Sequence, residues 1–125
     1  MNNAIIILDR SLPSARLATD LLKPVTGRII RARDEAEALE AIQRLNVEGA
    51  RQCMLLLSAS ATEGDVVSAI ENLRRKRPDL AVLLVMDSFD FGLVTEVRDC
   101  CGSLCDWAED HPTAEATRPR LWELI

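Results

Sequence analysis

The chain has 125 residues, of which 48% are hydrophobic and 28% charged, and its formal net charge is −5. This length suits one domain with one core, so we expect a single domain over residues 1–125. The acidic balance argues against a nucleic-acid surface, which needs a basic face, and no apolar stretch approaches the roughly 20 residues that cross a bilayer. Because Asp9 and Arg10 interrupt the first apolar run too early for a signal peptide, we expect a cytoplasmic protein.

Three short apolar runs predict strands at residues 4–8, 53–57 and 81–85. Runs of this length without alternation are typical of strands that are buried on both faces, in a parallel sheet covered by helices. Each run ends on a small group of polar residues. Ligands of such sheets collect beyond the carboxyl ends of the strands, so these three ends indicate where a functional site would lie.

The first half of the chain alternates strand and helix patterns. Ser11 is expected to cap a first helix that ends before Pro24, and residues 27–32 predict a short strand near a sheet edge. Asp34 is expected to cap a second helix, which Gly49 ends. We expect the buried stripe of that helix to contain these residues: Ala36, Leu39, Ile42, Leu45 and Val47.

A third helix is expected after the strand at 53–57. Thr62 is expected to cap it, and it ends in the cationic run 74–77 followed by Pro78. Four cations at a helix carboxyl end suit the negative end of the macrodipole. Binding of a partner or a nucleic acid is the alternative interpretation of this run.

The last part of the chain completes the alternation. Residues 91–101 predict a fourth helix and residues 104–107 a short fifth strand. The apolar residues 121–125 predict the start of a last helix, about 117–125, that is truncated or leads into a further domain. The fold class is therefore α/β: a doubly wound, five-stranded parallel sheet in the order 2-1-3-4-5, with helices on both faces.

No metal or nucleotide motif accompanies these elements. The cysteine spacing C-C-x3-C, with Cys53 apart from it, does not match a zinc or iron–sulfur site, so we expect thiols that pack as small apolar side chains. No glycine-rich phosphate-binding motif follows any strand. We therefore expect neither a metal nor another cofactor.

The strand ends and their spacing resemble the receiver domain of response regulators over essentially the whole chain. In that family, two acids after the first strand hold Mg²⁺, and here Asp9 is followed by Arg10. The phosphoacceptor aspartate follows the third strand, and here that position is Ser58. A threonine or serine ends the fourth strand, where this chain has Met86 followed by Asp87. The lysine that ends the fifth strand has no counterpart.

These departures imply a pseudo-receiver, a two-component signalling module without phosphorylation chemistry. It would not be an enzyme and would bind a protein partner or effector domain, or form a homodimer, with no contact to nucleic acid or membrane. Arg10 could supply the positive charge of a missing metal by pairing with Asp9 or Asp87. Ordinary structural roles remain open for these residues, with Asp9 and Ser58 as capping or turn residues and Met86 in the core.

The resemblance also implies an interaction surface, because receivers use the face formed by the fourth helix, the fifth strand and the fifth helix for output. The corresponding residues are Val94, Val97, Arg98, Cys101, Cys105 and Trp107. Trp107 could anchor a partner or could close the edge of the sheet. A different interpretation is the amino-terminal, flavodoxin-like wing domain of bacterial pyridoxal-phosphate lysine, ornithine or arginine decarboxylases, which has a structural and oligomerising role.

Overall fold

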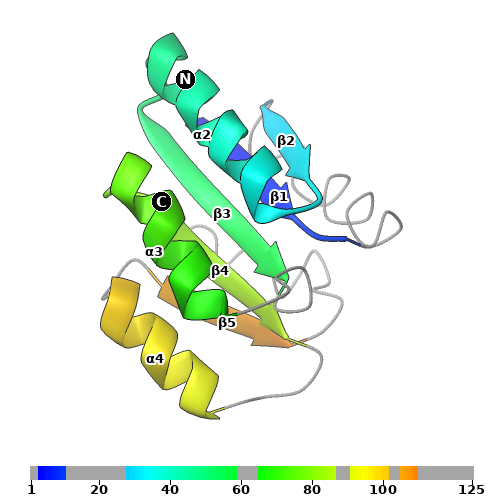
Figure 1. Cartoon of the computed structure of the whole chain (residues 1–125), viewed down its shortest axis with the longest axis vertical. Coiled ribbons are helices and arrows are strands. Elements are labelled where there is room, and N and C mark those ends of the chain that lie inside the picture. Colours follow the sequence, from blue (N-terminus) through cyan, green and yellow to red (C-terminus); the bar gives the residue numbers. More distant parts are fainter. Residues whose placement is uncertain (1–2, 11–27, 59–64, 87–90, 102–104, 110–125) are drawn as a thin grey trace.

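A computed structural model describes residues 3–10, 28–58, 65–86, 91–101 and 105–109 of the chain. Five parallel strands form one sheet in the order β2-β1-β3-β4-β5, which confirms the predicted topology (Figure 1). The strands are β1 (Asn3–Leu8), β2 (Ile29–Ala32), β3 (Gln52–Ser58), β4 (Ala81–Met86) and β5 (Cys105–Glu109). The described helices are α2 (Glu35–Glu48), α3 (Val66–Lys76) and α4 (Phe91–Cys101).

The central strands are buried on both faces, as their unbroken apolar runs predict. Ile6 pairs in register with Leu55, and Leu55 with Val82; these three side chains belong to one cluster with the apolar faces of α2, α3 and α4. Neighbouring residues such as Ile7 and Leu83 point to the second face, where they are also buried. The alternation follows from the period of two residues in a strand.

Helix α2 begins and ends where its capping residues predict. The Asp34 side chain accepts a hydrogen bond from the Glu37 backbone N–H, and Gly49 adopts the left-handed conformation at φ 77°. The predicted stripe is wrong at two positions, because Ala36 is exposed and Val47 is 89% exposed. Val47 lies two residues beyond buried Leu45, which turns it about 200° around the helix axis.

The observed boundaries of α3 and β5 also differ from the prediction. Asp65, and not Thr62, is the N-cap of α3: its carboxylate accepts hydrogen bonds from the Val67 backbone N–H and the Ser68 hydroxyl. Strand β5 runs two residues further than expected, so Trp107 lies in its middle and Glu109 at its end. Helix α4 has the predicted bounds.

Several predicted features lie outside the described residues. These are the first helix after Ser11, the Thr62 position, Asp87 and the last helix at about 117–125. Within the described ranges, no helix has the length and apolar character needed to cross a membrane.

Candidate functional site at the carboxyl edge of the sheet

The ends of the parallel strands bring the predicted site positions to one edge of the sheet. Ser58 ends β3 and pairs in register with Val85, while Met86 ends β4 and pairs with Glu109 at the end of β5. Because all five strands are parallel, these carboxyl ends share one edge, as the arrowheads in Figure 1 show. This is the edge at which α/β sheets bind their ligands.

Asp9 lies at the same edge, directly after β1. Leu8 pairs in register with Leu57, so the chain leaves β1 at the level where β3 ends in Ser58. The Asp9 backbone N–H donates a hydrogen bond to the Ala32 carbonyl at 3.0 Å, which ties this residue to the end of β2. Asp9 is half-buried and Arg10 is exposed. The register therefore groups Asp9, Arg10 and Ser58, as the sequence predicts.

The comparisons with known proteins concern the whole fold. No protein-family model matches the chain, and no curated protein sequence matches it. A response regulator from Thermotoga maritima is similar with a TM-score of 0.82 and 15% identity, covering 100% of this chain and 98% of that chain. Chemotaxis protein CheY4 of Vibrio cholerae is similar with a TM-score of 0.78 and 15% identity, covering 98% of both chains. A CheY-like protein, TadZ, from Pseudomonas aeruginosa reaches 21% identity with a TM-score of 0.70 and covers 98% of both chains.

The chain has the receiver fold of response regulators. At these identities the likeness establishes the fold alone, and a fold by itself does not determine function. The chemistry possible at the carboxyl edge of the sheet therefore depends on this chain's own residues.

Three of the described strands end at this edge in residue types that differ from those implied by the resemblance to receivers. Strand β3 ends in a hydroxyl group at Ser58, and β4 ends in the thioether of Met86. Strand β5 ends in Glu109, an acid at the end where the resemblance calls for a lysine. Among the described residues, no group of three or more histidine, cysteine, aspartate or glutamate side chains could hold a metal ion.

The predicted interaction surface on α4 and β5 needs a correction. Val94 is 5% exposed and Val97 is fully buried, because both face the sheet in the main core cluster. They therefore do not belong to a surface, whereas Arg98 on the same helix is exposed. Trp107 pairs in register with Leu84. The side chains of Trp107, Cys101 and Cys105 lie outside what the structure describes, so their part in a surface stays a prediction.

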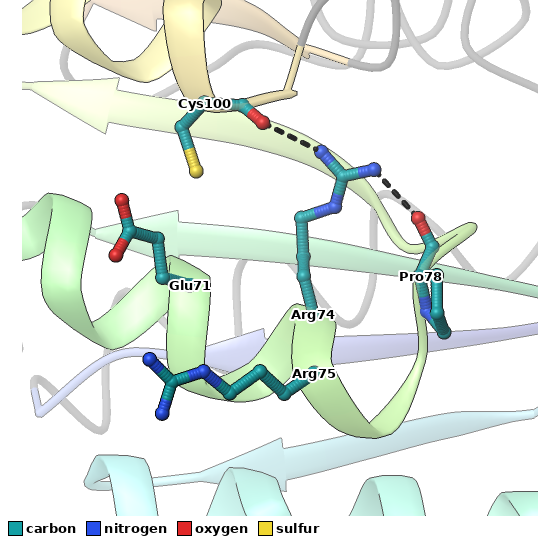
Figure 2. Close-up of a pocket in the computed structure, with 5 residues that line it drawn as sticks. All are labelled: Glu71, Arg74, Arg75, Pro78 and Cys100. Carbon is teal, nitrogen blue, oxygen red and sulfur yellow. Dashed lines mark hydrogen bonds between the residues drawn. The ribbon is translucent and has the colours of Figure 1, made fainter.

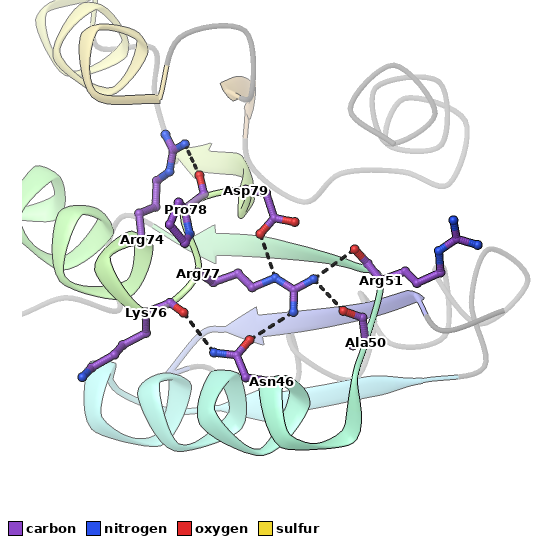
Figure 3. Close-up of polar contacts among 8 residues, drawn as sticks. All are labelled: Asn46, Ala50, Arg51, Arg74, Lys76, Arg77, Pro78 and Asp79. Carbon is purple, nitrogen blue, oxygen red and sulfur yellow. Dashed lines mark hydrogen bonds and ion pairs between the residues drawn. The ribbon is translucent and has the colours of Figure 1, made fainter.

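The opposite, amino-terminal edge of the receiver fold holds a polar cluster that sequence analysis missed. The side chain of Arg77, only 9% exposed, donates hydrogen bonds to Asp79 at 2.8 Å and to Asn46 at 3.1 Å. Its Nη2 atom donates to the Ala50 carbonyl at 2.7 Å and the Arg51 carbonyl at 3.0 Å (Figure 3). One guanidinium thus joins the end of α2, the start of β3 and the loop before β4.

A second arginine joins α3 to α4 beside an open groove. Arg74 donates hydrogen bonds to the Cys100 carbonyl at 3.2 Å and the Pro78 carbonyl at 2.6 Å (Figure 2). The groove has a volume of about 370 Å³ and is lined by Glu71, Arg74, Arg75, Pro78 and Cys100. The cationic run 74–77 therefore does more than complement the helix dipole, since two of its members bind carbonyl groups of other elements.

Cys53, near the Arg77 cluster, has a strongly shifted pKa. Burial raises the pKa of its thiol from 9.0 to about 11, with Asp79 adding to the rise and Arg77 opposing it. A thiol in this state is a poor nucleophile, which agrees with the prediction that Cys53 packs as an apolar residue.

The free energy of unfolding is expected to fall as the pH rises from 9.0 towards 11. In that window the unfolded chain releases the Cys53 proton while the folded chain retains it, so the stability present below pH 9.0 is lost. Urea titrations across this window, on wild type and Cys53→Ala, isolate the effect, and the chain has no tyrosine to titrate alongside. Parallel pH profiles for the two proteins would contradict it.

Proposed function

We propose that this chain is a receiver-fold regulatory module that is not phosphorylated and that acts by binding another protein. The observation that supports this most directly is Ser58 at the end of β3, level with the end of β1. Phosphoryl transfer to an aspartate uses a carboxylate that is already ionised at neutral pH. A serine hydroxyl is not ionised there and would need a neighbouring general base.

The charges at the edge also disfavour a divalent cation. Magnesium in proteins is held by carboxylates and other oxygen ligands. The positive charge of Arg10 follows Asp9 directly and opposes a metal ion there. Glu109 brings a negative charge to the end of β5, where a receiver that is phosphorylated has a lysine to pair with the phosphoryl group. Arg10 therefore disfavours magnesium at this edge, and Glu109 disfavours a phosphoryl group.

The partner side of the proposal draws on how receivers occur in other proteins. The match to NtrX from Brucella abortus covers 97% of this chain but 26% of that chain, and another match is the signal receiver domain of an HD domain-containing protein from Pseudomonas fluorescens. We propose that this chain likewise serves an effector, or pairs as a homodimer, in the cytoplasm, with Arg98 and Trp107 at the contact. These matches favour signalling over the decarboxylase wing domain.

The test is incubation with acetyl phosphate and Mg²⁺, followed by intact-mass measurement. Wild type is expected to gain no phosphoryl group, and its Trp107 fluorescence, recorded in a Trp122→Phe background, is expected to be unchanged by Mg²⁺ with beryllofluoride. The matched control carries Arg10→Asp, Ser58→Asp, Met86→Thr and Glu109→Lys, which supply the missing groups, and is expected to bind Mg²⁺ and to respond. A phosphoryl group on the wild type overturns the proposal.

A further inference from the structure

The amino-terminal edge of the sheet concentrates positive charge in a chain whose net charge is −5. Helices α2 and α3 end here, and β3 and β4 begin here. Hydrogen bonds across the edge join these parts: Asn46 of α2 donates to the Lys76 carbonyl at 2.9 Å, and Arg77 donates to the Ala50 and Arg51 carbonyls. The cations of this edge are Arg28, Arg44, Arg51, Arg74, Arg75, Lys76 and Arg77.

Some of these cations are already occupied. Arg77 forms an ion pair with Asp79, and Arg28 forms one with Glu48. Arg74 binds two backbone carbonyl groups. The carboxylates of Glu48, at the α2 end, and Asp79, in the loop before β4, thus pair with Arg28 and Arg77 and not with the remaining cations.

Four exposed cations remain: Arg44, one turn before the end of α2, and Arg51, Arg75 and Lys76, which lie next to Arg77 or its carbonyl partners. Among the residues that the structure describes, none forms an ion pair with any of these four. Glu71 precedes Arg75 by one helical turn, but in Figure 2 its carboxylate lies on the side of Cys100, apart from the Arg75 guanidinium. In Figure 3 the side chains of Arg51 and Lys76 extend outwards on opposite sides of the Arg77 network.

The backbone under these cations is held in place. The carbonyl of Arg51 accepts from Arg77, and the carbonyl of Lys76 accepts from Asn46, so the buried network fixes the two positions while their charged ends face solvent. A fixed backbone lowers the conformational entropy that binding would cost. Val47, next to Asn46 in α2, is 89% exposed and adds an apolar contact to the same region.

We propose that Arg51, Arg75 and Lys76, on either side of the Arg77 network, form a docking surface for an extended acidic segment of a protein partner. Charge complementarity attracts carboxylates to three cations that have no ion pair among the described residues, and exposed Val47 suits an apolar residue within such a segment. A nucleic acid is disfavoured because the whole chain is acidic and repels a polyanion at long range. The surface lies at the edge opposite Ser58, so the proposal does not depend on whether the chain is phosphorylated.

A labelled oligoglutamate peptide, titrated with the full chain by fluorescence anisotropy, tests this surface. Binding is expected to be saturable at low salt and to weaken as salt rises. The double variant Arg51→Gln, Lys76→Gln is expected to bind about fivefold more weakly, since exposed ion pairs contribute modestly. The control Arg31→Gln, Arg33→Gln removes two exposed cations from β2 and the turn after it and is expected to change affinity by less than about twofold.

The urea unfolding midpoint of each variant checks its fold. The midpoint is expected to stay near that of the wild type, because the substitutions leave the hydrogen-bonded carbonyls of Arg51 and Lys76 in place. Equal weakening in the two double variants overturns the proposal, because it shows a response to net charge alone. Absence of saturable binding by wild type overturns it as well. Tighter binding of a single-stranded oligonucleotide, or of phosphatidylserine vesicles, than of the peptide at physiological salt also overturns it and assigns the surface to another class of ligand.

Discussion

Arg77→Ala is expected to lower the free energy of unfolding by about 3 kcal/mol. The substitution removes four hydrogen bonds from one guanidinium and leaves the Asp79 carboxylate without its ion pair. Two backbone carbonyls, of half-buried Ala50 and exposed Arg51, lose their donor. The effect is large because four hydrogen bonds are lost together, and each contributes about 0.5–1.5 kcal/mol.

Arg75→Ala is the matched control, since it removes the same side chain two residues earlier. Arg75 is exposed and has no ion pair among the described residues, so its loss is expected to change stability by less than about 0.5 kcal/mol. Arg77→Lys separates charge from geometry: one ammonium cannot reach four acceptors in the fork arrangement, so it is expected to recover less than half of the loss. Urea unfolding followed by circular dichroism measures all three. Equal effects of Arg75→Ala and Arg77→Ala would show that the network contributes little.

The role of Arg77 could not be predicted from the sequence. Its neighbours in the cationic run have the same charge and nearly the same chemistry, and the partner that distinguishes it, Asn46, lies 31 residues away. Only the packing of the α2 end against the α3 end selects which of the four cations is buried. The interpretation by the helix dipole uses the local sequence alone. It explains why cations are favoured at a helix carboxyl end, but it does not explain the contacts of Arg77.

The strands and their order could be predicted because a strand that is buried on both faces is an uninterrupted apolar run in the sequence. Residues 4–8 and 81–85 are apolar without interruption, and the structure confirms them within β1 and β4. Helix α2 could be placed from Asp34 and Gly49, whose side chain and backbone conformation act locally. The end of β5 was harder to predict, because Asp106 and Glu109 interrupt the apolar pattern. The strand is defined by its pairing with β4.

The location of the candidate site could be predicted for the same reason, since parallel strands place their carboxyl ends together. Asp9, Arg10 and Ser58 follow from strand ends that the structure confirms to within a residue. Glu109 does not, because the sequence predicts that the fifth strand ends at Trp107. The surface position predicted for Val94 and Val97 is wrong because a resemblance identifies a helix and not which side of it faces the sheet.

Leu57→Asp is expected to prevent folding, whereas Ser58→Asp is expected to cost about 1 kcal/mol or less. Leu57 is fully buried and pairs in register with Leu8 and Leu84 on the face covered by the helices. An aspartate there loses the apolar contacts of leucine, about 2–5 kcal/mol, and adds the cost of burying a carboxyl group. Together these approach the whole stability of a domain, about 5–15 kcal/mol.

Ser58 is half-buried at the strand end, so a carboxylate at that position can stay hydrated. Expression as soluble protein and far-UV circular dichroism distinguish the two variants, and Leu57→Asn, which carries no charge, separates loss of packing from burial of charge. If Ser58→Asp were as damaging as Leu57→Asp, position 58 would belong to the core, and serine there would be a packing choice. If it folds as expected, the receiver edge of this chain tolerates an acid at position 58, and packing does not impose the serine found there.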